Sequence, residues 1–213
     1  VLDIVSPGGE VTASEDLHFE VLKLRENKPV IASVDELAAS GAYYVASASD
    51  QIYAKPGSEV GNIGVISILP EPDLLDEVLI TTGPFKLSGG PQVSYVRQME
   101  MLKDMFLGAV MTQRADRLNV GPEVLSRGEL YLGLQAQQMG LIDHIGSQGQ
   151  AISAAAEMAR VRHYDIVDYT PELPEDDILF GFKSRRGSTA ATVAAIPGHL
   201  PPGFYYRFVE PPQ

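Results

Sequence analysis

Ser33-Val-Asp-Glu-Leu-Ala-Ala-Ser-Gly-Ala-Tyr-Tyr-Val-Ala-Ser47 is the stretch that decides the fold. The apolar strand Pro29–Ala32 precedes it, and a helix of small residues occupies its second half. Ser40 stands between strand and helix, with only small residues beside its hydroxyl group. The first turn of a helix presents backbone N–H groups that can hold an anion, so this position suits the nucleophile of a hydrolase. A serine there is also a common helix cap, so the local pattern leaves both interpretations open.

Strand and helix patterns alternate outward from this stretch. We expect strands at Val1–Val5, from Val30, at Gln51–Ala54, in the apolar run Val65–Leu69 and at Leu141–Ile145. We expect helices capped by Thr12 or Ser14, after Ser40, at Leu74–Leu79, at Gln98–Asn119, at Leu134–Met139 and from Ser147 to about Ala159. Strands separated by helices of this length predict an α/β fold with a parallel sheet covered on both faces.

Apolar spacing indicates which helix faces are buried. Leu17, Val21 and Leu24 follow one another at i, i+4 and i+7, which predicts one apolar face for the first helix. In the longest helix, the apolar stripe is predicted to consist of Leu102, Phe106, Ala109, Val110 and Leu118.

Composition excludes several classes of function. The chain has 213 residues, of which 45% are hydrophobic, and a formal net charge of −12. This acidic balance argues against a nucleic-acid partner, because phosphate binding needs clustered Lys and Arg. Without cysteine there is no disulfide framework, no thiolate metal site and no cysteine nucleophile. We expect no cofactor and no metal.

The two ends of the chain differ from its middle. The first residues form a strand-like segment without an initial methionine, which indicates a fragment of a longer protein that can carry an N-terminal anchor. No run approaches the roughly 20 apolar residues of a membrane span. Beyond Thr170 the composition becomes acidic and proline-rich, and Ala195–Gln213 is rich in proline and aromatic residues. We therefore interpret 1–169 as the folded domain and 170–213 as a C-terminal extended tail.

A glycine-rich turn follows the first predicted strand. In Ser6-Pro-Gly-Gly9, glycine leaves backbone N–H groups unobstructed, which suits an oxyanion hole. The alternative is an ordinary Pro-Gly turn.

A nucleophilic serine needs a base. None of the four histidines, His18, His144, His163 and His199, follows a strand end or glycine turn at the expected edge of the sheet, and His18 is expected on a surface helix. A Ser-His-Asp triad is therefore unsupported.

Lysine is the other base known for serine, and it must be buried to lose its proton. Lys86 has no acidic neighbour in the sequence, whereas Lys55 is expected to be solvated in its Pro-Gly turn. Lys86 is the better candidate.

These segments together resemble the signal peptide peptidase A family of membrane-associated Ser/Lys proteases. The resemblance covers roughly residues 1–159. Its motifs are Ser6-Pro-Gly-Gly9, Lys28-Pro-Val-Ile-Ala32, Ala39-Ser-Gly-Ala-Tyr-Tyr44, Gly61-Asn-Ile-Gly-Val65, Gly83-Pro-Phe-Lys86, Gly128-Glu-Leu-Tyr-Leu-Gly-Leu-Gln-Ala136 and Gly140-Leu-Ile-Asp143. The resemblance implies a crotonase/ClpP-like fold, in which residues 1–169 form a Ser/Lys peptidase domain that lacks its earlier strands and membrane anchor.

The resemblance also implies roles for individual residues. Ser40 matches the nucleophile, Lys86 the general base, and Gly8, Gly9 and Gly41 the positions whose N–H groups form the oxyanion hole. The family usually has Gly-Ser-Ile-Gly where this chain has Asn62, so Asn62 is only a candidate for orienting the lysine.

Three functions follow as hypotheses. The first is a serine endopeptidase for hydrophobic, membrane-derived peptides, membrane-associated with an extracytoplasmic catalytic domain. The resemblance implies that it assembles as a homo-oligomer, and the methionines of the long helix offer a surface that can adapt to a partner. The second is a crotonase-like acyl-CoA enzyme, which would need neither Ser40 nor Lys86. The third is an inactive membrane-associated scaffold.

Overall fold

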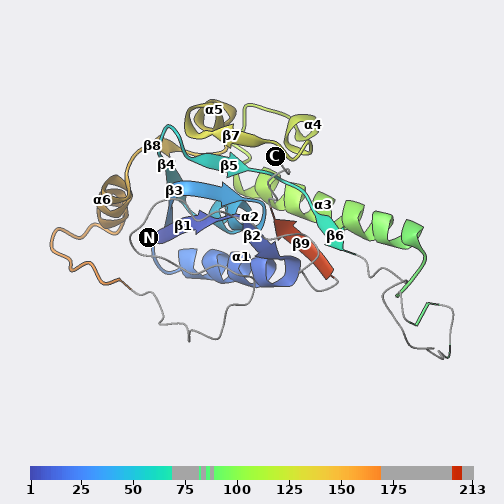
Figure 1. The fold of residues 1–213 in the computed structure, drawn as a ribbon. Coiled ribbons are helices and arrows are strands. Elements are labelled where there is room, and N and C mark those ends of the chain that lie inside the picture. The colour runs from blue at the N-terminus through green and yellow to red at the C-terminus, as the bar shows by residue number, and fades with distance from the viewer. Residues whose placement is uncertain (69–81, 83–84, 87–88, 169–202, 208–213) are drawn as a thin grey trace.

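The computed structural model describes residues 1–68, 82, 85–86, 89–168 and 203–207. Its strands are β1 Leu2–Ser6, β2 Gly8–Glu10, β3 Ile31–Ala39, β4 Gln51–Ala54, β5 Glu59–Gly61, β6 Ile66–Ile68, β7 Leu130–Leu132, β8 His144–Ile145 and β9 Gly203–Arg207. Its helices are α1 Val11–Arg25, α2 Gly41–Ser47, α3 Gln92–Gln113, α4 Pro122–Leu125, α5 Gly133–Met139 and α6 Gln148–Met158. The alternation of strands and helices confirms the predicted α/β fold (Figure 1).

Strand β3 is the centre of the main sheet. It pairs in parallel with β1 between Ala32 and Ala38, with β4 along its first half and with β5 at its C-terminal end. The sheet order is β7-β5-β3-β4-β8, with β1 also on β3, and β7 alone runs antiparallel to its neighbour. The predicted parallel sheet is therefore mixed at one edge. A second, three-stranded sheet has the order β2-β9-β6.

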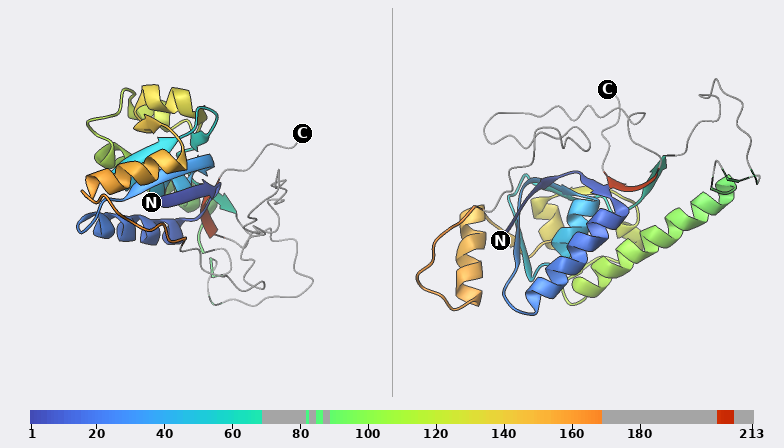
Figure 2. Two further views of the ribbon diagram at one scale, coloured as in Figure 1. Left: turned by 90° about the vertical axis from the view of Figure 1, so that its left-hand side faces the viewer. Right: turned by 90° about the horizontal axis from the view of Figure 1, so that it is seen from below.

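Helices cover the main sheet on both sides (Figures 1 and 2). One core runs from the sheet through α2 to the C-terminal half of α3, where Phe106 and Val110 are fully buried. In the described part of the chain, none of the helices has the length and apolar character needed to cross a membrane.

Helix α1 buries a different face from the one predicted. Its buried residues are Val11, Ser14, His18 and Val21, which also follow one another at helical spacing. Leu17 is 58% exposed and Leu24 is 40% exposed. The helix begins at Val11 with Glu10 at its N-cap position, so neither Thr12 nor Ser14 is its cap. Because His18 is only 2% exposed, the prediction that it lies on a surface helix is wrong.

Other boundaries also differ from the predictions. Strand β3 continues to Ala39, immediately before Ser40, instead of ending near Ala32. Helix α3 begins and ends six residues earlier than the predicted Gln98–Asn119. The cap at Ser147 is confirmed, since its side chain accepts a hydrogen bond from the Gln150 N–H. The helix predicted at Leu74–Leu79 lies outside the described residues.

A buried ion pair fastens α3 to the sheet. Arg114, whose side chain is fully buried, donates from Nη1 to Asp143 Oδ2 at 2.8 Å and from Nη2 to Oδ1 at 3.0 Å. It also donates from Nε to the carbonyl of Gly140 at 3.1 Å. Asp143 Oδ2 in turn accepts from the Ile52 N–H of β4 at 2.7 Å. Arg114 and Asp143 therefore join three segments: the C-terminal end of α3, residues 140–143 and β4.

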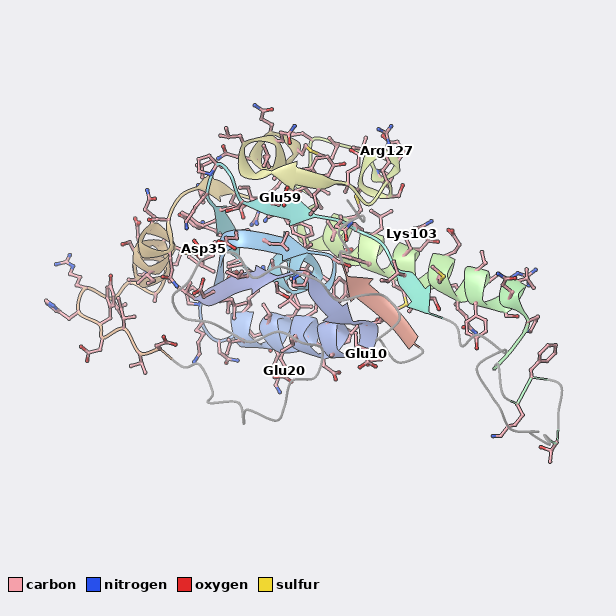
Figure 3. The ribbon with its side chains drawn as sticks, in the orientation of Figure 1. Glu10, Glu20, Asp35, Glu59, Lys103 and Arg127 are labelled. Carbon is pink, nitrogen blue, oxygen red and sulfur yellow. The ribbon has the colours of Figure 1, made fainter. Side chains whose placement is uncertain are left out.

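Arg114→Met is expected to destabilise the domain by about 3–5 kcal/mol, because it leaves the Asp143 carboxylate mostly buried without its main partner. The matched control is Arg127→Met at the exposed pair with Glu129 (Figure 3), which should change stability by no more than about 0.5 kcal/mol. Urea unfolding of the two variants measures the difference. Equal stabilities would contradict this role of Arg114.

Candidate active site

Ser40 occupies a strained turn between β3 and α2. Its backbone has φ 54° and ψ −122°, in a region that residues with a Cβ rarely adopt. The residue is 1% exposed, and its Oγ is buried without a hydrogen-bond partner among the residues that the structure describes. It does not act as the helix cap, since its side chain makes no capping hydrogen bond. The capping interpretation left open by the sequence is therefore wrong.

Both features of Ser40 cost stability. Backbone strain of this kind costs about 1–3 kcal/mol, and an unsatisfied buried hydroxyl costs about 1–3 kcal/mol more. A fold keeps such a residue only where its surroundings hold it. Backbone strain at a reactive residue is typical of active sites. A nucleophilic serine on a sharp strand-to-helix turn is a recurrent example.

The turn is held by the backbone of the β5 region. The Ser40 N–H donates to the carbonyl of Gly61 at 2.8 Å, and the Ser40 carbonyl accepts from the Tyr44 N–H at 2.9 Å. Asn62 follows Gly61 with φ 54°, a left-handed conformation that asparagine tolerates better than most residues. Its Nδ2 donates to the carbonyl of Gly128 at 2.7 Å, so the Asn62 side chain braces this turn.

The predicted oxyanion residues come from two segments. Gly8 and Gly9 lie on β2, which contacts α2, and Gly41 is the buried first residue of α2. Gly8 has φ 95°, which requires glycine, and its N–H donates to Ser6 Oγ at 3.2 Å. Apart from Gly9 and its two chain neighbours, none of the described side chains or backbone atoms lies within 4 Å of the place that a Cβ of Gly9 would take.

His18 supports the helix that follows Ser40. Its Nδ1 lies 2.8 Å from the carbonyl of Tyr44, and the two rings stack with centroids 4.3 Å apart. Burial lowers the pKa of His18, against the smaller opposite effect of that hydrogen bond, so the ring stays neutral near pH 7. It makes no hydrogen bond to Ser40 Oγ. The 11, 14, 18, 21 spacing was the sequence signal for this buried position.

Lys86 is exposed in a turn, whereas Ser40 is buried. Phe85 and Lys86 are exposed and belong to a turn closed by a 2.6 Å hydrogen bond from the Gly89 N–H to the Phe85 carbonyl, just before α3. Figure 1 and the right-hand view of Figure 2 place this turn beyond the N-terminal end of α3, away from β3 and α2. Phe106 packs against Tyr44 one helical turn after Ser40, and Gln92 is about 21 Å from Phe106 along the helix. Ser40 is therefore buried at the start of α2, whereas Lys86 is exposed in the turn before α3.

Lys55 was the other lysine considered as a base. Lys55 forms an ion pair with Asp35 at the surface, which confirms that it is solvated. Among the described residues, no group of three or more His, Cys, Asp or Glu side chains could hold a metal ion.

Comparison with known proteins places these features in a family. Residues 23–162 match the model of peptidase family S49. The chain is 34% identical over 196 residues to a protein of Methanocaldococcus jannaschii whose name suggests a protease, covering 85% of this chain and 62% of that protein. It is 31% identical to protease 4 of Haemophilus influenzae, covering 83% of this chain and 31% of the relative. It is 30% identical to the chloroplastic serine protease SPPA of Arabidopsis thaliana, covering 86% and 30%.

These relatives are longer than the chain, which spans between 30% and 62% of their lengths. A solved structure from the enoyl-CoA hydratase/isomerase family of Silicibacter pomeroyi aligns with TM-score 0.40 at 17% identity, over 70% of this chain and 48% of that one. That likeness is too loose to add to the description of the fold. The match to the family model extends over α2 with its strained turn, the main sheet except β1, and α3, and the chain belongs to peptidase family S49.

Proposed function

We propose that this chain is the catalytic domain of a serine endopeptidase that uses a Ser40/Lys86 dyad. The observation that carries the proposal is the Ser40 turn, where a strained backbone holds a buried hydroxyl that has no partner. Membership of a peptidase family supports the same reaction. Glycine would adopt the backbone conformation of this turn without strain, so the strain at Ser40 comes from its having a side chain.

The chemistry assigns one role to each group. The neutral amine of Lys86 takes the proton of Ser40 Oγ, and Oγ attacks the peptide carbonyl carbon. The N–H groups of Gly8, Gly9 and Gly41 stabilise the negative charge that develops on the carbonyl oxygen. The lysine ammonium then returns its proton to the departing amine, which leaves an acyl-enzyme ester on Ser40. Water hydrolyses this ester with Lys86 again as the base.

The position of Lys86 makes assembly part of the proposal. The turn that carries it projects beyond the N-terminal end of α3 (Figure 1), and the first half of that helix exposes Val93, Val96 and Met101. An element that projects from one subunit can reach the site of a neighbour in a head-to-tail ring. We propose a homo-oligomer in which Lys86 of one copy completes the site around Ser40 of the next.

Hydrophobic, membrane-derived peptides such as cleaved signal peptides are the proposed substrates. No charged residue lies within the predicted oxyanion turn 6–9 or among residues 38–46, so the surroundings of Ser40 favour apolar side chains. A site for such peptides is best placed beside a membrane, on its extracytoplasmic side.

A panel of peptides tests this specificity. Peptides with small or apolar residues on both sides of the cut are expected to be hydrolysed at least about tenfold faster than matched peptides with Lys or Asp there, since burial of an unpaired charge next to Ser40 is unfavourable. Mass spectrometry of the products locates each cut. A preference for Lys or Asp beside the cut would contradict the proposed substrate class.

A further inference from the structure

One peptide group at the end of β5 is hydrogen-bonded on both sides. Strand β5 lies between β3 and β7 in the main sheet (Figure 1). The Gly61 carbonyl accepts from the Ser40 N–H at 2.8 Å, and the Asn62 N–H donates to the Glu129 carbonyl at 2.8 Å. This carbonyl and this N–H belong to the same planar peptide unit. The Gly61–Asn62 peptide therefore links the residue after β3 to the residue before β7.

The Asn62 side chain adds a second hydrogen bond to the same segment. Its Nδ2 donates to the Gly128 carbonyl at 2.7 Å, one residue before the carbonyl that holds its N–H. The left-handed backbone of Asn62, with φ 54°, lets its N–H and its side chain point to the same neighbour. Bonds to two consecutive carbonyls fix both the position and the tilt of the peptide that meets Ser40.

The segment before β7 lies against this peptide too closely for a side chain at position 61. A Cβ on Gly61 would be 3.0 Å from the Glu129 carbonyl oxygen and 3.3 Å from the Tyr131 ring. Residues 128–131 begin the Gly128–Ala136 motif, to which the proposed chemistry gives no role. This motif thus supports the turn that carries Ser40.

Ser40 depends on such support because its backbone is strained. A conformation of this kind persists only where the surrounding structure determines it. The bond from the Ser40 N–H to the Gly61 carbonyl is one of the contacts that do so. Because this N–H is already bonded, it does not point at an oxyanion, which agrees with the choice of other backbone donors for that role.

We propose that Asn62 is a positioning residue for Ser40, which it holds through the Gly61–Asn62 peptide and the Gly128 carbonyl. The proposal rests on the proposed peptidase function, since it concerns the geometry of the nucleophile. Misplacement of a reacting atom by about 1 Å can slow a reaction by about a hundredfold, so loss of this brace should affect the reaction. Orientation of Lys86, the other role considered for Asn62, predicts different results.

Two substitutions at position 62 remove the brace in different ways. Asn62→Gly removes the side chain and accepts the left-handed backbone without strain. Asn62→Asp keeps the shape and tolerates this backbone, but it replaces the donor that faces the Gly128 carbonyl with a carboxylate oxygen. The matched control is Asn119→Gly. Asn119 makes the same pair of bonds to the end of α5, from its N–H to the Met139 carbonyl at 3.0 Å and from Nδ2 to the Gln138 carbonyl at 2.9 Å.

Hydrogen exchange at single amides of the full chain measures the brace without catalysis. The Ser40 amide is expected to exchange at least about fivefold faster in both position-62 variants, the effect of one lost hydrogen bond, and at the wild-type rate in Asn119→Gly. The Ile52 amide on β4, which donates to Asp143, should keep the wild-type rate throughout and so reports general unfolding. A Ser40 amide that exchanges equally in the wild type and both variants would overturn the proposal. Equal acceleration at Ile52 would also overturn it, because the effect would then be general.

The rate constant for labelling of Ser40 by a fluorophosphonate measures the effect on the reaction. We expect it to fall about tenfold or more in both position-62 variants. In Asn62→Gly the pH of half-maximal labelling should stay the same, because the base is unchanged. A shift of that pH with an unaltered Ser40 amide would assign Asn62 to Lys86 and overturn the proposal. A wild type that is not labelled at all would refute the Ser40/Lys86 dyad, whereas exchange at the Ser40 amide would still decide whether Asn62 holds the turn.

Discussion

Ser40→Ala is expected to lower peptide hydrolysis by at least about a thousandfold, because the proposed attack on the carbonyl carbon has no other oxygen nucleophile in place. The fold should remain intact. The Ser40 Oγ makes no hydrogen bond, so its removal leaves no partner unsatisfied. Hydrolysis of a fluorogenic apolar peptide, together with urea unfolding, measures the two effects.

Ser40→Gly separates the chemical role of Ser40 from its strain. Both variants lack the hydroxyl group and should be equally inactive. Only glycine also relieves the conformation at φ 54° and ψ −122°, so Ser40→Gly should be more stable than Ser40→Ala by about 1 kcal/mol or more. An alanine variant that retained the wild-type rate would remove Ser40 from the mechanism.

Lys86→Arg is expected to be as inactive as Lys86→Ala, because a guanidinium group does not give up its proton in proteins. Both variants should unfold at the wild-type urea concentration, since the side chain is exposed and lies outside the core. An active arginine variant would show that positive charge, rather than proton transfer, is what position 86 supplies.

Assembly predicts one further result for the same residue. If Lys86 serves the site of a neighbour, a mixture of equal parts Ser40→Ala and Lys86→Ala subunits forms some sites with both groups intact. With random head-to-tail assembly this fraction is about one quarter, so the mixture should regain about a quarter of the wild-type rate. Two inactive proteins that stay inactive on mixing would contradict completion of the site by a neighbour.

Local sequence patterns predicted much of the core, because periodic apolar residues report burial directly. The strands at Gln51–Ala54 and near Val1, the cap at Ser147 and the buried Phe106 and Val110 all follow from such patterns. The position of Ser40 between strand and helix was also visible. The backbone strain at Ser40 was not visible in the sequence, because only the φ and ψ angles distinguish this turn from the start of an ordinary capped helix.

Features that depend on contacts distant in the sequence were not predictable in this way. Leu17 and Leu24 had the spacing of a core face, yet α1 turns a face with Ser14 and His18 inward, because Tyr44 offers His18 a carbonyl and a ring. The pairing of β9 with β2 joins residues about 200 positions apart, and no local pattern encodes it. Nor did a local pattern show that Lys86 is exposed in a turn closed by Gly89, just before α3.

Labelling with a fluorophosphonate probe tests the Ser40/Lys86 dyad most directly, because the probe reacts only with an activated serine hydroxyl. Intact-mass spectrometry of the assembled protein, followed by peptide mapping, gives the extent and position of the adduct. We predict one adduct per chain, on Ser40, in the wild type and none in Lys86→Ala over the same time. Equal labelling of both proteins, or an adduct on any other serine, would contradict the proposed dyad.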